Sequence, residues 1–118
     1  MMNGDDRTVV QRPLTQPERQ LVEFLLHLAE QADIHDLNSA RVQDMNDGGM
    51  GSLRFGESRG GRLGHIVAEA EFVDEDGLPV FASLFLDQSN ALYDLGLWKV
   101  DFSPLKRIPE PSQFKAAR

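Results

Sequence analysis

At 118 residues the chain has room for one domain with one hydrophobic core, which excludes a two-domain organisation. It contains no cysteine, so disulfides, thiolate metal ligands and cysteine nucleophiles are excluded as well. Its 19 acidic residues outnumber 12 Lys and Arg residues, and the formal net charge of -7 has the wrong sign for a general binder of nucleic acids or anionic membranes.

The beginning of the chain does not resemble a signal peptide. Asp5 and Asp6 stand where a signal peptide has basic residues, and no apolar segment follows them. The longest apolar cluster, VFASLFL at residues 80–86, is too short to cross a bilayer. We therefore expect a cytoplasmic protein that contacts neither membranes nor nucleic acid.

The first element predicted along the chain is an amphipathic helix within residues 14–33. Thr15 followed by Glu18 matches a capping box, and Pro17 lies in the first turn, where its missing N–H costs little. Apolar side chains then recur with helical spacing and define a stripe for burial against the rest of the domain. This stripe consists of Leu21, Phe24, Leu25 and Leu28.

The glycine-rich stretch MNDGGMGSLRFG, residues 45–56, has the composition of a phosphate-binding loop or of a turn. It lacks both GxxxxGK[ST] and GxGxxG, and a strand pattern follows it instead of a helix. We therefore predict a β-hairpin of residues 41–45 and 50–55, with Gly48 or Gly49 at positive φ in its turn. An anion-binding nest of backbone N–H groups is the alternative.

After residue 63 the apolar pattern changes to a period of two, which is typical of strands. Residues 64–74 place an apolar face opposite a partly acidic one, and the two sets are Ile66, Ala68, Ala70 and Phe72 against Val67, Glu69, Glu71 and Val73. Residues 78–87 are apolar on both faces, which predicts a central position in the sheet.

Residues 91–102 predict the last strand of the sheet. The side chains expected to fill the core from this strand are Trp98, Val100 and Phe102. Lys99 and Asp101 then point to the outer face, where they can form cross-strand ion pairs. Gly96 lies where the alternation slips, which predicts a β-bulge at this position.

These elements predict an α+β fold with one N-terminal amphipathic helix packed on a four- or five-stranded, mainly antiparallel meander sheet. The helix stripe and one face of the sheet can then cover each other. We expect a single domain over residues 1–118, with residues 1–11 and 110–118 frayed.

A candidate partner-binding surface follows from the distribution of charge. Residues 63–98 contain no Lys or Arg, and the acidic side chains there include the candidate partner-binding residues Glu69, Glu71, Asp74, Glu75 and Asp76. A solvated sheet face without a partner is the alternative. His65 and Glu69 share a strand face but lie about 13 Å apart, too far to hold one ion, and Glu69 and Glu71, about 6.6 Å apart, would need further ligands from a facing strand. We expect no metal site, and we expect no cofactor.

A second candidate site is a charged pocket at the rim of the sheet. It would bring together Asp47, Arg54, Lys99 and Asp101 to bind a small anionic substrate. A core strand with a charged outer face is the alternative. No residue is assigned a catalytic role, because neither His27 nor His35 stands near an arrangement that resembles a catalytic triad.

Three phrases of the sequence resemble a family of small, uncharacterised bacterial domains. These are an RPLT..E opening at residues 12–18, DGGMGSLRF at residues 47–55 and WKVDFSPL at residues 98–105. The resemblance extends over residues 12–109. It implies a bacterial cytosolic protein of the kind often encoded as a small stand-alone gene, and it implies no activity or catalytic residue.

Our leading hypothesis is a non-enzymatic protein-binding domain, an immunity- or antitoxin-like inhibitor whose acidic sheet face masks a basic surface of another protein. A small enzyme or ligand-binding domain that uses the charged rim pocket is the second hypothesis. The third is a homodimeric accessory domain whose exposed apolar strand face pairs with itself.

Overall fold

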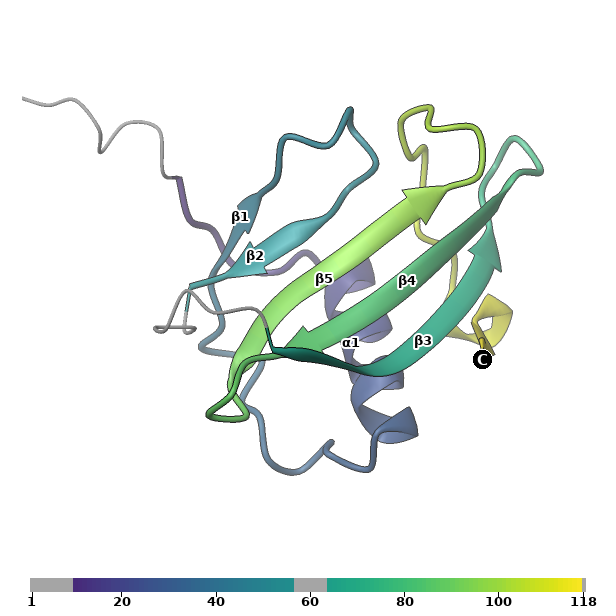
Figure 1. Cartoon of the computed structure of the whole chain (residues 1–118). Coiled ribbons are helices and arrows are strands. Elements are labelled where there is room, and N and C mark those ends of the chain that lie inside the picture. The colour runs from purple at the N-terminus through teal and green to yellow at the C-terminus, as the bar shows by residue number, and fades with distance from the viewer. Residues whose placement is uncertain (1–9, 57–63, 118) are drawn as a thin grey trace, which may run out of the picture.

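One α-helix and six strands form two layers in the computed structural model, which describes residues 10–56 and 64–117. Helix α1 (Gln16–Leu28) lies across one face of the sheet, and no helix of the described residues covers the opposite face (Figure 1). The predicted α+β class is therefore confirmed. The strands are β1 (Val42–Asp44), β2 (Leu53–Phe55), β3 (His65–Val73), β4 (Pro79–Leu86), β5 (Leu92–Lys99) and β6 (Lys115–Ala116).

The sheet has the strand order β1-β2-β5-β4-β3-β6, and all of its neighbouring strands are antiparallel. Only β3, β4 and β5 form the predicted meander, although β4 is central as expected. The β1–β2 hairpin pairs with β5 instead of β3, because Leu53 and Leu95 lie opposite each other in the core. Six strands replace the four or five that we predicted.

The C-terminal tail is part of the fold, in contrast to the predicted fraying of residues 110–118. A short 3₁₀-helix, η2 (Pro111–Gln113), leads into β6, which pairs with β3. The buried ring of Phe114 lies between Phe24 and Phe72, with centroid distances of 5.4 and 6.0 Å. These aromatic contacts hold the tail against the core. The expected fraying of residues 1–9 and of residue 118 lies outside the described residues.

Helix α1 begins as predicted, with a complete capping box between Thr15 and Glu18. The face it buries is rotated from the predicted one, because Val22 and Leu26 are buried, whereas Phe24 is only partly buried and packs on Phe114. Leu28 is 41% exposed, so its assignment to the core was wrong. The side chains that α1 buries are Leu21, Val22, Leu25 and Leu26.

A β-bulge changes the predicted alternation in β3. The pairing with β4 shifts between Ile66 and Ala68, which leaves Ile66 47% exposed instead of buried. Ala68, Ala70 and Phe72 point into the core as predicted.

The orientation predicted for β5 was wrong, because Leu95 and Leu97 fill the core and set the alternation of this strand. Lys99 consequently points inward, and Trp98 lies on the opposite face and is 45% exposed. The strand ends at Lys99, so residues 100–102 form a turn and do not continue the core face. The register shift lies beside Tyr93, and Gly96 pairs regularly with Ser83.

The glycine-rich stretch forms the predicted hairpin connection. Gly48 and Gly49 have φ of 78° and 85°, which a residue with a Cβ adopts only at a cost. Asp47 closes the connection by accepting hydrogen bonds from the backbone N–H groups of Met50 and Ser52, at 3.1 and 3.0 Å. The stretch is therefore a turn that joins β1 to β2.

Candidate functional site

The five candidate partner-binding residues fall into two groups. Glu69 and Glu71 lie on the face of β3 that points away from α1. The other three, Asp74, Glu75 and Asp76, lie in the turn between β3 and β4, where they contact Lys99 at the end of β5 or the segment that follows it. Glu75 is exposed and pairs with Arg107 at 3.6 Å, a contact that contributes little at the surface.

Asp74 is not on the surface, since it is only 4% exposed and forms an ion pair with the buried Lys99. The Lys99 ammonium donates to Asp74 Oδ2 at 2.8 Å, to Asp76 Oδ2 at 2.6 Å and to the Pro104 carbonyl at 3.2 Å. Three backbone amides also donate to the Asp74 carboxylate, those of Glu75, Lys106 and Arg107. This cluster joins the β3–β4 turn to the segment that follows β5.

Hydrogen bonding keeps both partners of this pair charged. Burial alone would raise the pKa of Asp74, but the Lys99 ammonium and the backbone amides outweigh burial and lower the pKa. Burial likewise opposes the charged form of Lys99, and the two carboxylates outweigh it and raise its pKa. Lys99 and Asp74 therefore stabilise the fold by holding the β3–β4 turn against the end of β5.

The structure does not assemble the predicted rim pocket, because its four residues have separate partners. Asp47 closes the β1–β2 turn, and Lys99 belongs to the buried cluster. Arg54 pairs with Asp94 and lies over the ring of Tyr93, 4.6 Å from its centroid. Asp101 accepts two hydrogen bonds from Ser103 in its own turn. None of the four lines the groove that crosses the sheet on the face opposite α1.

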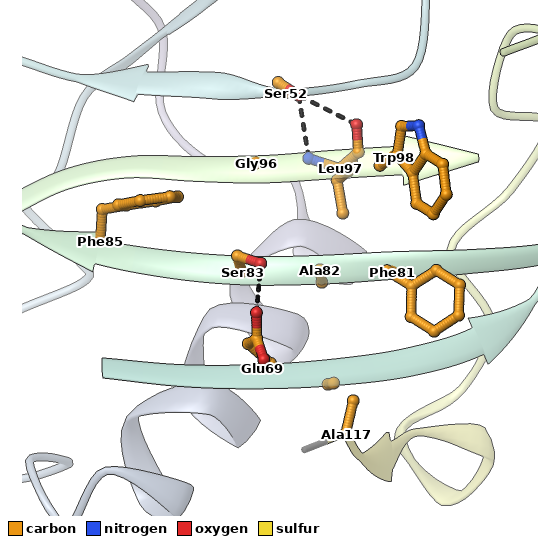
Figure 2. A pocket seen from close by; sticks show the side chains of 11 residues that line it. Ser52, Glu69, Phe81, Ala82, Ser83, Phe85, Gly96, Leu97, Trp98 and Ala117 are labelled. Carbon is orange, nitrogen blue, oxygen red and sulfur yellow. Dashed lines mark hydrogen bonds between the residues drawn. The ribbon is translucent and has the colours of Figure 1, made fainter. Parts of the chain in front are cut away.

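A groove of about 520 Å³ crosses the sheet on the face opposite α1, which we call the open face (Figure 2). Its floor is a row of residues on neighbouring strands, in which Ser83 of β4 lies between Glu69 of β3 and Gly96 of β5. On one side the rings of Phe81 and Trp98 pack together at 5.6 Å, and on the other side Phe85 closes the groove (Figure 2).

No side chain rises from the floor of the groove at Gly96. Neither a positive φ nor the register shift requires glycine at this position. A Cβ atom there would meet Phe85 Cε1 at 3.7 Å and the Ser83 carbonyl at 3.9 Å, which are ordinary contacts. A glycine inside a strand weakens the strand, and it often marks a place where a ligand approaches the backbone.

Glu69 is the only charged residue among the described residues that line the groove. Its carboxylate accepts one long hydrogen bond, from Ser83 Oγ at 3.4 Å, and forms no ion pair within the described part of the chain. Ser52 lies at the end of the groove farthest from Glu69 (Figure 2). Its hydroxyl donates a hydrogen bond to the Leu97 carbonyl and accepts one from the Leu97 backbone N–H. A carboxylate beside aromatic rings is suited to binding a cation.

Sequence reasoning missed this groove, although the sequence contained signs of it. Phe81 and Phe85 lie on the second apolar face of residues 78–87, a pattern that by itself predicts only a central strand. The sequence pattern places Trp98 in the core and Gly96 in a bulge, and the structure shows neither. In the structure, Phe81, Phe85 and Trp98 surround the row of the sheet that contains Ser83 and Gly96.

No helix in the described ranges 10–56 and 64–117 is long and apolar enough to cross a bilayer. Within the same ranges, no three His, Asp or Glu side chains are grouped so that they could hold a metal ion.

A family model described as Domain of unknown function (DUF6984) matches residues 11–109 of the chain. These limits agree with the span over which the sequence resembles a family of uncharacterised domains. No curated protein and no solved structure matches the chain.

Proposed function

This chain belongs to the DUF6984 family, and we propose that it is a non-enzymatic protein-binding domain that uses its open face to bind a protein with a basic surface. The observation that supports this proposal most strongly is the composition of that face. Exposed aromatic rings lie there beside carboxylates that have no ion-pair partner in the described chain. Aromatic side chains supply much of the energy of protein interfaces.

The aromatic part of this surface extends beyond the groove. Trp98 contacts Phe81 on one side and Phe102 on the other, with centroid distances of 5.6 and 5.9 Å. Phe102 is exposed, and it lies in the turn that follows β5. A cluster of exposed aromatic residues is costly in water and is typical of an interaction surface.

The charge of the open face supports a basic partner. Glu69 and Glu71 lie next to the aromatic cluster, Arg54 is neutralised by Asp94, and Lys115 of β6 stands opposite Glu71 without an ion pair in the described chain. Opposite charge on a partner accelerates encounter and disfavours acidic competitors, including nucleic acids. An immunity- or antitoxin-like inhibitor that acts in the cytoplasm is the specific form of binding protein that we propose.

We expect Glu69→Gln combined with Glu71→Gln to slow association about tenfold at low salt, because charge at an interface acts mainly on the on-rate. The melting temperature should stay nearly unchanged, since neither carboxylate forms an ion pair within the described chain. The measurement is affinity capture from the native host, followed by binding kinetics with the purified partner at two salt concentrations.

The matched control removes the same charge from the helix side of the molecule. Glu23→Gln combined with Glu30→Gln changes two exposed residues, one on α1 and one directly after it, and should leave association unchanged. Equal slowing by both double variants would show that only net charge matters. Equal binding by the wild type and the Glu69/Glu71 variant at low salt would contradict the proposal.

A homodimer through the same face is the second candidate, and the exposure of Trp98 and Phe102 favours it. Sedimentation of the purified chain separates the two candidates. A dimer that Trp98→Ala dissociates would support self-association, whereas a monomer would leave the open face free for a different protein.

A further inference from the structure

We propose that the groove of the open face binds one arginine side chain of the partner protein, with its guanidinium at Glu69 and its stem between the aromatic walls. This inference rests on the proposed function and makes it more specific. It assigns the groove to one side chain and identifies Glu69 as the residue that recognises its charge. Glu71 and the exposed ring of Phe102 then lie outside this pocket.

The dimensions of the groove fit a single long side chain. Phe81 and Phe85 are four residues apart on β4, so their Cα atoms are separated by about 13 Å along the strand. Between these two rings, β4 contributes only the short side chain of Ser83. Its neighbour on β5, Gly96, contributes no side chain. The groove volume of about 520 Å³ gives one arginine side chain ample room.

The chemistry of the lining favours a cation over a neutral side chain. Glu69 carries the only charge among the described lining residues, and its one hydrogen-bond donor is the distant Ser83 hydroxyl. Cations are attracted to the faces of Phe and Trp rings, and Trp98 is the strongest such site here. An arginine entering the groove therefore finds both an uncompensated carboxylate and aromatic surface.

Arginine suits this combination better than lysine. Its planar guanidinium stacks on aromatic rings, and two parallel N–H groups can donate to one carboxylate. Lysine has a compact, strongly hydrated ammonium, which would lose more water on entering a groove with aromatic walls. The lining therefore discriminates between the two basic side chains.

Gly96 provides an independent argument that the floor is kept open. A strand residue with ordinary φ and room for a Cβ has no structural need to be glycine, and β-branched residues are favoured in strands. We expect Gly96→Val to fill the centre of the groove while it keeps or raises the melting temperature. Gly96→Val should weaken binding of the partner protein only if a side chain of that partner enters the groove.

The direct test uses Nα-acetyl-arginine amide as the probe, and intrinsic fluorescence as the readout. Trp98 is the only tryptophan of the chain, so its emission reports on the wall of the groove. We expect saturable binding at millimolar concentrations, with at least tenfold weaker binding of the neutral isostere Nα-acetyl-citrulline amide. Glu69→Gln should remove this preference, and the helix-side control Glu23→Gln should retain it.

Several results would overturn the proposal. These are no saturable change in Trp98 emission with the arginine probe, equal binding of the citrulline probe, stronger binding of Nα-acetyl-lysine amide, and unchanged binding to Gly96→Val. Binding of the captured partner separates this proposal from the function on which it rests. If Gly96→Val binds the partner normally while the Glu69/Glu71 variant does not, the groove assignment fails and the open-face function remains.

Discussion

Asp74→Asn is expected to lower the free energy of unfolding by about 3–5 kcal/mol, the cost of removing one partner from a buried ion pair. The carboxylate accepts hydrogen bonds from the Lys99 ammonium and from three backbone amides. An amide side chain has one acceptor oxygen and directs an N–H group toward the remaining donors. The change therefore leaves buried donors without acceptors and loosens the segment after β5.

Denaturant unfolding measures this effect, and Asp76→Asn is the matched control. Asp76 contacts the same ammonium, but its side chain is 27% exposed and can be replaced by water. We expect the control to cost much less, because Lys99 keeps Asp74 and the Pro104 carbonyl as acceptors. Equal losses in the two variants would contradict the structural role that we assign to Asp74.

The same carboxylate makes stability depend on pH. The pKa of Asp74 lies below its ordinary value of 3.8, because its hydrogen bonds outweigh the opposing effect of burial. A lowered folded-state pKa gives stability that is present above the ordinary pKa and is lost as the pH falls through the lowered pKa. Stability should therefore fall in acid below about pH 4, and less steeply in Asp74→Asn.

Leu25→Ala is expected to lower the free energy of unfolding by about 2–5 kcal/mol, because it removes a fully buried side chain from the contact between α1 and the sheet. Leu28→Ala makes the same change one turn later at an exposed position, and it should cost less than about 0.5 kcal/mol. The pair tests which face of the helix is buried.

Denaturant melts of the two leucine variants provide the measurement, with far-UV circular dichroism to show that the helix is retained. A larger loss in Leu28→Ala than in Leu25→Ala would mean that the helix packs through the stripe we first predicted from the spacing of apolar residues. Losses within about 0.5 kcal/mol for both would place α1 away from the core.

Elements whose cause lies in a short stretch of sequence were predictable from the sequence. The capping box of Thr15 and Glu18 located the start of α1, and the run of glycines located the turn between β1 and β2. Residues 78–87, apolar on both faces, became the central strand β4. In each case the physical cause lies within a few residues of the structure that it produces.

Features that depend on distant residues were not predictable in the same way. Lys99 is buried because Asp74 and Asp76, more than 20 positions earlier, neutralise it, and no local pattern shows this pairing. The β1–β2 hairpin likewise joins β5 instead of β3 through contacts of Leu53 with Leu95. Bulges at Ile66–Ala68 and beside Tyr93 shift the alternation from which inward and outward faces are inferred.

The groove of the open face depends partly on local sequence patterns and partly on contacts between distant residues. Glu69 was identified from the sequence as part of an acidic strand face, and it keeps that place in the structure. The aromatic walls were not identified, because the inward face of β5 was assigned to Trp98 and not to Leu97. The row of Glu69, Ser83 and Gly96 spans three strands, so only their register brings these residues together.

NMR of the ¹⁵N-labelled chain, titrated with the captured partner, shows whether the open face binds a protein. We expect the indole N–H signal of Trp98 and the amide signals of Ser83 and Gly96 to shift or broaden on binding. Amide signals from the exposed side of α1, including those of Glu23 and His27, should not change. Changes on α1 with an unperturbed Trp98 indole would contradict the claim.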